Sequence, residues 1–111
     1  MSNVVPMRPQ LPKTLTRDEA AALVLGILDD GGKIIWSEHA EQRMDERDVT
    51  VRQVIQVLRR GNVTAAPVFT VDRDWKITME AITAGDNLRV VVAVDVDRMG
   101  FMMLVVTVVV I

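Results

Sequence analysis

The spacing of hydrophobic positions changes from helical to extended near residue 61. Before that point, apolar residues recur three and four positions apart, as in Leu23, Val24, Ile27 and Leu28, which is the spacing of one buried helix face. After it, apolar residues alternate with polar ones or run continuously, which is typical of strands. The pattern therefore predicts helices first and a sheet afterwards, an α+β fold.

Two of the expected helices begin at capping boxes. Thr16 is followed three positions later by Glu19, and Thr50 by Gln53, so that each threonine and its partner can satisfy backbone donors of the first turn. We expect the first helix to end at the Asp-Asp-Gly-Gly run of residues 29–32. The third helix is expected to end at Gly61, which can adopt a left-handed C-cap.

A short strand and a charged helix lie between them. Residues 33–36 read as the strand, and the helix is expected from Ser37 to about Asp48.

Four strands are expected in the second part, over residues 63–71, 75–83, 88–96 and 101–111. Their connections can join antiparallel neighbours but are too short for parallel crossovers. The expected architecture is therefore N-terminal helices packed on a four-stranded antiparallel meander sheet.

The last two strands are apolar on both faces, because residues 90–94, 102–106 and 108–111 are all hydrophobic. A sheet with one face in water should alternate, so we expect both faces to be covered. The first helix and a partner subunit are the two candidate covers. A homodimer formed through this face is one expectation.

Composition narrows the class of protein. The chain has 111 residues, no cysteine and a single histidine, so neither a disulfide framework nor a metal cluster is expected, and no cofactor. Residues 1–15, with three prolines, read as a flexible leader before a single domain of residues 16–111. No apolar run approaches the length of a membrane span, which favours a cytoplasmic protein.

The charged helix carries a basic stripe. His39, Arg43 and Arg47 recur every four residues and therefore lie along one side of it, next to an Ala40/Met44 seam that can face the core. Adjacent like charges repel, so the stripe needs an anion nearby.

Two readings of the stripe are open. In one, acids such as Glu80, Asp95 or Asp97 pair with the arginines and the stripe is structural. In the other, the stripe lines a cleft in which a phosphate replaces the carboxylate, which suits the forked guanidinium geometry. The net charge of −2 argues against a broad nucleic-acid surface, so any such contact is expected to be local.

The run S-E-H-A-E-Q-R-M-D-E-R-D-V-T-V-R-Q-V-I-Q-V-L-R-R-G, residues 37–61, resembles domain-of-unknown-function family 4258, whose pattern is approximately S-x-H-A-x-x-R-M-x-E-R-G-I. The resemblance continues more weakly through D-W-K-I-T-M, L-R-V-V-V-A-V-D and V-V-T-V, and covers residues 33–111. This sequence departs from the family pattern at Asp48, where the family usually has glycine, and its net charge is acidic.

This resemblance implies a domain similar to the RelE/BrnT-like ribonuclease toxins, of the barnase/RelE group, which cleave RNA without metal through attack of the 2′-hydroxyl on the adjacent phosphate. Carried over by position, His39 would be the general base or acid, and Arg43 and Arg47 would neutralise the phosphate. Thr107 matches the polar residue of the closing strand.

Three other residues are weaker candidates for substrate contact. Lys76 could add a cation beside Trp75, although Trp75 is more often a core residue than a base-stacking surface. Arg89 could face the same cleft, and Thr107 could instead be β-branched packing.

The leading hypothesis is therefore a cytoplasmic, bacterial or phage-type, metal-independent endoribonuclease or RNA-binding toxin. Its partners would be single-stranded RNA and an antitoxin-like protein. The alternative is a non-catalytic protein-interaction module of the same fold.

Overall fold

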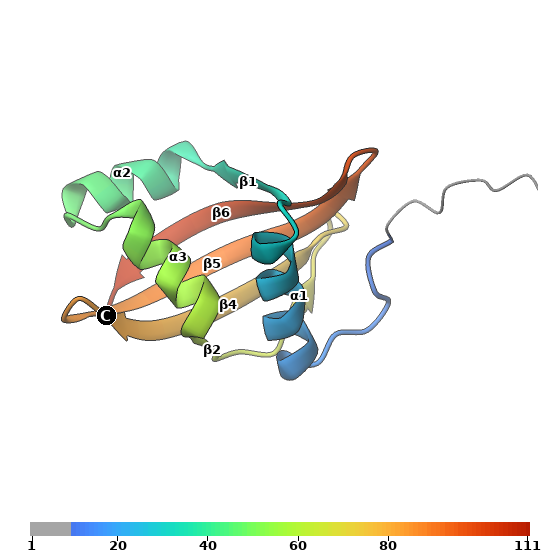
Figure 1. Ribbon diagram of the computed structural model, residues 1–111, viewed down its shortest axis with the longest axis horizontal. Coiled ribbons are helices and arrows are strands. Elements are labelled where there is room, and N and C mark those ends of the chain that lie inside the picture. The colour runs from blue at the N-terminus through green and yellow to red at the C-terminus, as the bar shows by residue number, and fades with distance from the viewer. Residues whose placement is uncertain (1–9) are drawn as a thin grey trace, which may run out of the picture.

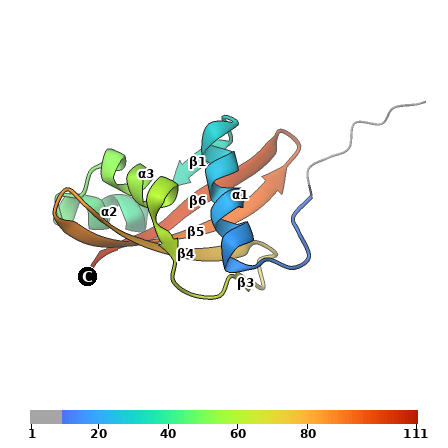
Figure 2. The same cartoon turned by 60° about the horizontal axis from the view of Figure 1, so that its bottom comes forward.

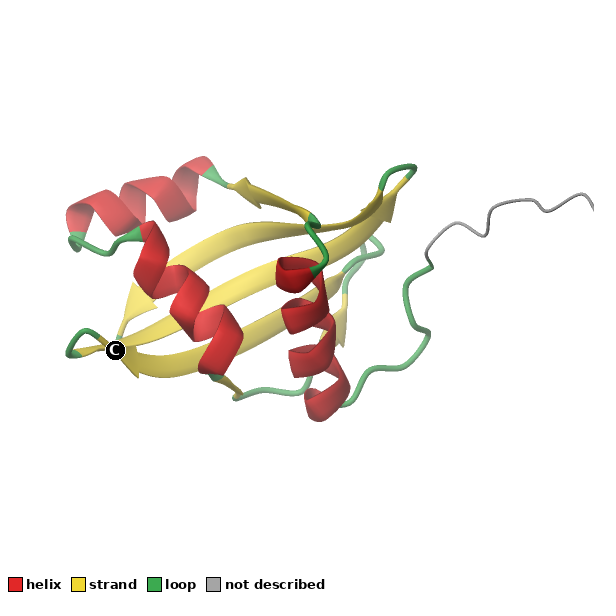
Figure 3. Cartoon of the chain, in the orientation of Figure 1, coloured by secondary structure: helices red, strands yellow, loops and turns green. Residues whose placement is uncertain are grey.

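A computed structural model of the chain describes residues 10–111 and confirms the α+β class (Figure 1, Figure 3). The helices are α1 (Arg17–Asp29), α2 (Glu38–Glu46) and α3 (Val51–Arg60). The strands are β1 (Lys33–Trp36), β2 (Asn62–Val63), β3 (Val68–Phe69), β4 (Trp75–Thr83), β5 (Asp86–Asp97) and β6 (Gly100–Val110).

Both predicted capping boxes are formed. The Thr16 hydroxyl accepts from the Glu19 N–H at 3.1 Å, and the Glu19 carboxylate accepts from the Thr16 N–H at 2.9 Å. Thr50 and Gln53 make the same reciprocal pair at the start of α3. These local signals place the helix starts because they satisfy donors that would otherwise lack partners.

The sheet is six-stranded and mixed, with the order β1-β6-β5-β4-β2 and with β3 also paired to β4. β4, β5 and β6 pair antiparallel in the predicted order, and β2 and β3 also pair antiparallel with β4. The expected four-stranded, wholly antiparallel sheet was nevertheless wrong, because the sheet has six strands and is mixed. β1 pairs in parallel with β6, from Lys33 opposite Met102 to Trp36 opposite Val105. This parallel pair is possible because most of the domain, rather than a tight turn, connects the two strands.

The strand expected over residues 63–71 is also interrupted. It consists of the two short strands β2 and β3, which pair with different parts of β4. Pro67 lies between them and has no backbone N–H to give to a ladder, which explains the break.

All three helices pack on the same face of the sheet (Figure 1, Figure 2). The core between them is built almost wholly from aliphatic side chains: Ala20, Val24, Ile27, Ala40, Met44, Val54, Val57, Leu58, Ile77, Met79, Leu88, Val90, Val92, Val94, Met103, Val105 and Val108. The expectation that α1 could cover the second face was therefore wrong, since α1 joins this core.

The second face carries the alternate residues of the strands. Ile35, Thr78, Val91, Ala93 and Leu104 lie there, are half-buried by one another and belong to no part of the core. No helix of residues 10–111 lies over these residues, which we call the open face (Figure 2).

The predicted leader lies partly outside the described residues, since 1–9 are not described. Within residues 10–15, Leu11 and Leu15 pack against the core, and the Trp75 indole N–H donates to the Pro12 carbonyl at 2.8 Å. Trp75 is 6% exposed and meets Phe69 edge to face, with ring centroids 5.2 Å apart. The prediction that Trp75 is a core residue is thus confirmed, and its indole ring offers no surface on which a base could stack.

Gly61 does not adopt the predicted left-handed cap, because its φ is −73°. A side chain at this position would instead meet backbone. A Cβ atom would lie 2.4 Å from the Val57 carbonyl oxygen and 2.9 Å from that of Glu80. Glycine is needed here for the close approach of α3 to β4.

Candidate active site

Hydrogen bonds of Ser37 connect the start of α2 to the last strand, β6. As N-cap, the Ser37 hydroxyl accepts from the Ala40 N–H at 3.0 Å and donates to the Val106 carbonyl at 2.8 Å. The Ser37 N–H also donates to the Val105 carbonyl at 3.1 Å. The helix turn that carries His39 is therefore fixed against β6.

The end of α2 is a Schellman motif. The Val49 N–H donates to the Met44 carbonyl at 2.9 Å, while Asp48 has a φ of 53° and Arg47 is the C-cap. Asp48 occupies the left-handed position that glycine usually fills, and aspartate is one of the residues that tolerate it. The departure from the family pattern at Asp48 therefore leaves the turn after Arg47 intact.

A β-bulge in β6 changes which residues at the end of this strand face the core. Val92 pairs with Val105 but Val91 pairs with Thr107, so Val106 is an extra residue on β6. After the bulge, Val108 is buried at 2% exposure. Thr107 then lies opposite the open-face residue Val91 and beside α2.

Four predicted site residues line one hollow of about 230 Å³ between α2 and the end of β6: His39, Arg43, Arg47 and Thr107, joined by Val108, Val109 and Val110. The three basic side chains belong to exposed residues, and Figure 1 shows α2 beside the end of β6. None of the lining residues carries a carboxylate. The hollow is therefore a small, cation-lined site open to solvent.

The two arginines have little internal compensation. Arg43 lies 3.5 Å from Glu46, with both side chains nearly half exposed, and exposed pairs of this kind contribute at most about 1 kcal/mol. Arg47 forms no ion pair with any residue in the range 10–111. Both guanidinium groups are thus free to bind an external anion.

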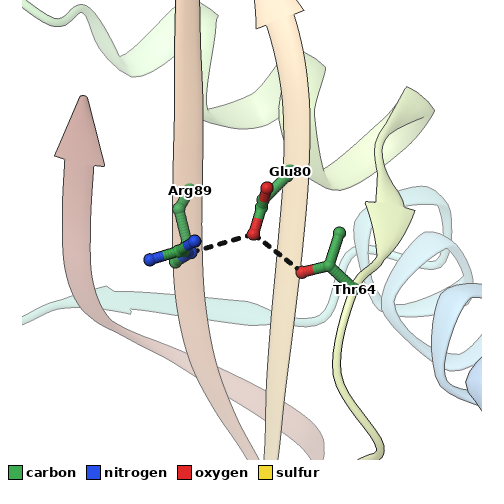
Figure 4. Close-up of polar contacts among 3 residues, drawn as sticks. All are labelled: Thr64, Glu80 and Arg89. Carbon is green, nitrogen blue, oxygen red and sulfur yellow. Dashed lines mark hydrogen bonds and ion pairs between the residues drawn. The ribbon is translucent and has the colours of Figure 1, made fainter. Parts of the chain in front are cut away.

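The acids that were candidates to pair with Arg43 and Arg47 make other hydrogen bonds. Glu80 accepts from Arg89 Nε at 2.9 Å and from the Thr64 hydroxyl at 2.9 Å (Figure 4). Asp95 accepts from the Val96 N–H within β5, and Asp97 accepts from the Met99 N–H of the turn that follows β5. The reading in which these acids pair with Arg43 and Arg47 was therefore wrong.

The contact with Glu80 also accounts for Arg89. Hydrogen bonds from Arg89 and then Thr64 lower the pKa of Glu80, because they favour the ionised carboxylate. Arg89 lies on β5 and Lys76 on β4, and neither lines the hollow. The structure does not bring these two predicted contact residues to the other four.

A larger hollow of about 610 Å³ lies between α1 and the β5–β6 hairpin, lined in part by Leu23, Ile27 and Phe101. It contains no histidine or arginine, and its charged residues, Asp30, Lys33 and Asp97, are of both signs. Size alone would favour this hollow, but the convergence of like-charged donors identifies the smaller one as the candidate for anion chemistry.

Residues 10–111 contain neither a cluster of metal ligands nor a helix that could span a membrane. No cluster of three or more histidine, aspartate or glutamate side chains is placed to hold a metal ion. No helix in that range has the length and apolarity needed to cross a membrane.

Sequence reasoning missed the second role of Ser37. Its position before a helix signalled the cap, but nothing local signalled a bond to a strand 69 residues away.

Comparison with known protein families identifies the family of the chain. The family model described as domain of unknown function DUF4258 matches residues 36–110, which includes α2 and all of β6. No curated protein and no solved structure matches the chain.

Proposed function

The chain belongs to the DUF4258 family, and we propose that it is a cytoplasmic, RelE/BrnT-like endoribonuclease that works without metal. The observation that supports this proposal is the meeting of His39, Arg43, Arg47 and Thr107 in one open hollow without a carboxylate. A site with two uncompensated guanidinium groups favours a bound phosphate, and a neighbouring imidazole can move a proton.

In the proposed reaction, His39 takes the proton of an RNA 2′-hydroxyl as the 2′-oxygen attacks the adjacent phosphorus. The bond from phosphorus to the 5′-oxygen breaks, and the protonated imidazole gives its proton to that oxygen. The products are a 2′,3′-cyclic phosphate and a 5′-hydroxyl. Arg43 and Arg47 stabilise the charge that gathers on the non-bridging oxygens, and Thr107 donates a hydrogen bond to one of them.

Lys76 and Arg89 take no part in this core of the proposal. A role for them in substrate binding would require an RNA long enough to continue from the hollow across β5 to β4.

The test is a cleavage assay on an end-labelled single-stranded RNA in the presence of EDTA. We expect cutting that leaves a cyclic phosphate and that stops when the nucleotide before the cut carries 2′-O-methyl. His39→Ala should reduce the rate by about 10²–10⁴-fold while most binding remains. Arg43→Ala and Arg47→Ala should weaken both binding and cutting, and binding should fall as salt rises.

Arg60→Ala is the matched control, because Arg60 is an exposed helical arginine outside the hollow. It should leave cutting unchanged. Cutting that requires metal, acts equally on DNA or persists fully without His39 would refute the proposed mechanism.

A second candidate function is supported by a separate observation, the open face. Its apolar residues Ile35, Val91, Ala93 and Leu104 are only partly shielded by their neighbours. We propose that a second copy of the chain covers them in a homodimer, and an antitoxin-like protein is the other partner that the resemblance implies. Val91→Lys should shift a dimer to monomer in analytical ultracentrifugation, whereas a wild-type chain that stays monomeric at high concentration would exclude the homodimer.

A further inference from the structure

The outer edge of β6 is unpaired beyond the bulge. β1 pairs with β6 only from Met102 to Val105, and at Ser37 the chain turns away into α2. The Val106 carbonyl then accepts a hydrogen bond from the Ser37 hydroxyl. Beyond it, no strand of the described residues pairs with the outer edge of β6 at Val108–Val110. This free edge forms one wall of the hollow that also contains His39, Arg43 and Arg47.

The phase of the ladder decides which backbone groups point to that edge. The Ile111 N–H donates to the Asn87 carbonyl at 2.8 Å, so these opposed residues form a hydrogen-bonded pair with β5. Hydrogen-bonded pairs recur at every second residue of an antiparallel ladder. Val109 therefore bonds toward β5, while the N–H groups of Val108 and Val110 point away from β5 to the free edge.

The balance of donors and acceptors at this edge selects the kind of ligand. The outward backbone groups of Val108 and Val110 alternate, one N–H and one C=O from each residue, as at any free edge of an antiparallel strand. The surplus of donors comes from the guanidinium groups of Arg43 and Arg47, which line the same hollow. An added peptide strand needs donors and acceptors in alternation. A phosphate, with several acceptor oxygens and negative charge, matches a surplus of donors.

We propose that the free-edge amides of Val108 and Val110 are the backbone half of a phosphate site whose side-chain half is Arg43 and Arg47. This inference deepens the proposed function, but it requires only that the hollow binds phosphate and not that it cleaves RNA. It also gives a reason for the bulge, because one residue fewer before Thr107 would exchange the outward and inward amides of the strand end.

The test uses the full-length ¹⁵N-labelled protein titrated with inorganic phosphate at constant ionic strength. We expect the amide protons of Val108 and Val110 to move downfield together, with smaller shifts at Thr107 and Val109. In hydrogen exchange on the free protein, the amide of the exposed residue Val110 should exchange at least about tenfold faster than that of Val109, which is bonded to β5.

Proline substitutions give a matched pair of variants. Val110→Pro removes an outward N–H from an exposed edge residue, where proline is tolerated, so the fold should persist while phosphate affinity falls roughly tenfold or more. Val109→Pro removes a ladder bond to β5, and it should lower the melting temperature. Equal effects of the two prolines on stability would contradict the assigned phase.

The outcomes separate this inference from the proposed function. Amide shifts with phosphate in a protein that does not cut RNA would support the site and overturn the nuclease. RNA cleavage without any phosphate response at Val108 and Val110 would overturn the site and leave the nuclease. Slow exchange of the Val110 amide, or its protection by pairing with another strand, would also overturn the phosphate site.

Discussion

Loss of the Ser37 hydroxyl should destabilise the domain more than loss of an ordinary helix cap. In Ser37→Ala, the Ala40 N–H loses its acceptor and the Val106 carbonyl loses its donor. Removing an N-cap costs about 1 kcal/mol, and a neutral hydrogen bond contributes about another 1 kcal/mol. The expected loss in the free energy of unfolding is therefore about 2 kcal/mol.

Two controls divide that loss into its parts. Thr16→Ala removes a helix cap that has no long-range bond, so it should cost about 1 kcal/mol. Ser37→Asp keeps an acceptor for Ala40 but has no proton for Val106, so it should also lose about 1 kcal/mol. Ser37→Thr keeps both functions and should remain close to the wild type.

Urea unfolding followed by circular dichroism measures these differences, and thermal unfolding should show a loss of about 8 °C for Ser37→Ala. If Ser37→Ala costs no more than Thr16→Ala, the bond from α2 to β6 contributes nothing measurable. The bond would then not be what fixes the turn carrying His39 against β6.

Three other substitutions test separate features. Asp48→Gly should raise stability by up to about 1 kcal/mol in urea unfolding, because Asp48 is left-handed, whereas a loss would contradict the Schellman assignment. Gly61→Ala should cost about 1–3 kcal/mol, since its Cβ would lie 2.4 Å from the Val57 carbonyl oxygen, and an unchanged melting temperature would contradict that contact. The pKa of Glu80 is lowered by Arg89 below its ordinary value of 4.5, so this contribution to stability is present above that pH and is lost as the pH falls through the lowered pKa. Glu80→Gln should therefore make stability less dependent on pH below about 4.5, and an unchanged acid unfolding curve would count against the pair.

The sequence predicted features that depend on near neighbours. The helix starts at Thr16 and Thr50 were predicted correctly because all residues of a capping box lie within four consecutive positions. The stripe of His39, Arg43 and Arg47 was found for the same reason, since its geometry is a property of one helix.

Features that depend on strand pairing were not found. The parallel pairing of β1 with β6 joins residues 33–36 to residues 102–105, and no local pattern specifies such a partner. Lys76 was assigned to the site although the predicted meander already places the strand of residues 88–96 between its strand and the last one, and the structure has this order. The resemblance to the family, rather than periodicity, is what linked Thr107 to α2.

The bond between Ser37 and Val106 joins residues 69 positions apart, and this separation has a consequence for how the protein is made. A ribosome adds roughly 5–20 residues per second, so α2 is synthesised several seconds before β6. During that interval the helix has neither the strand that anchors its first turn nor the edge that completes the hollow. The basic stripe of a nascent chain therefore has no assembled site, and any activity of the hollow begins only after β6 has left the ribosome and closed the sheet.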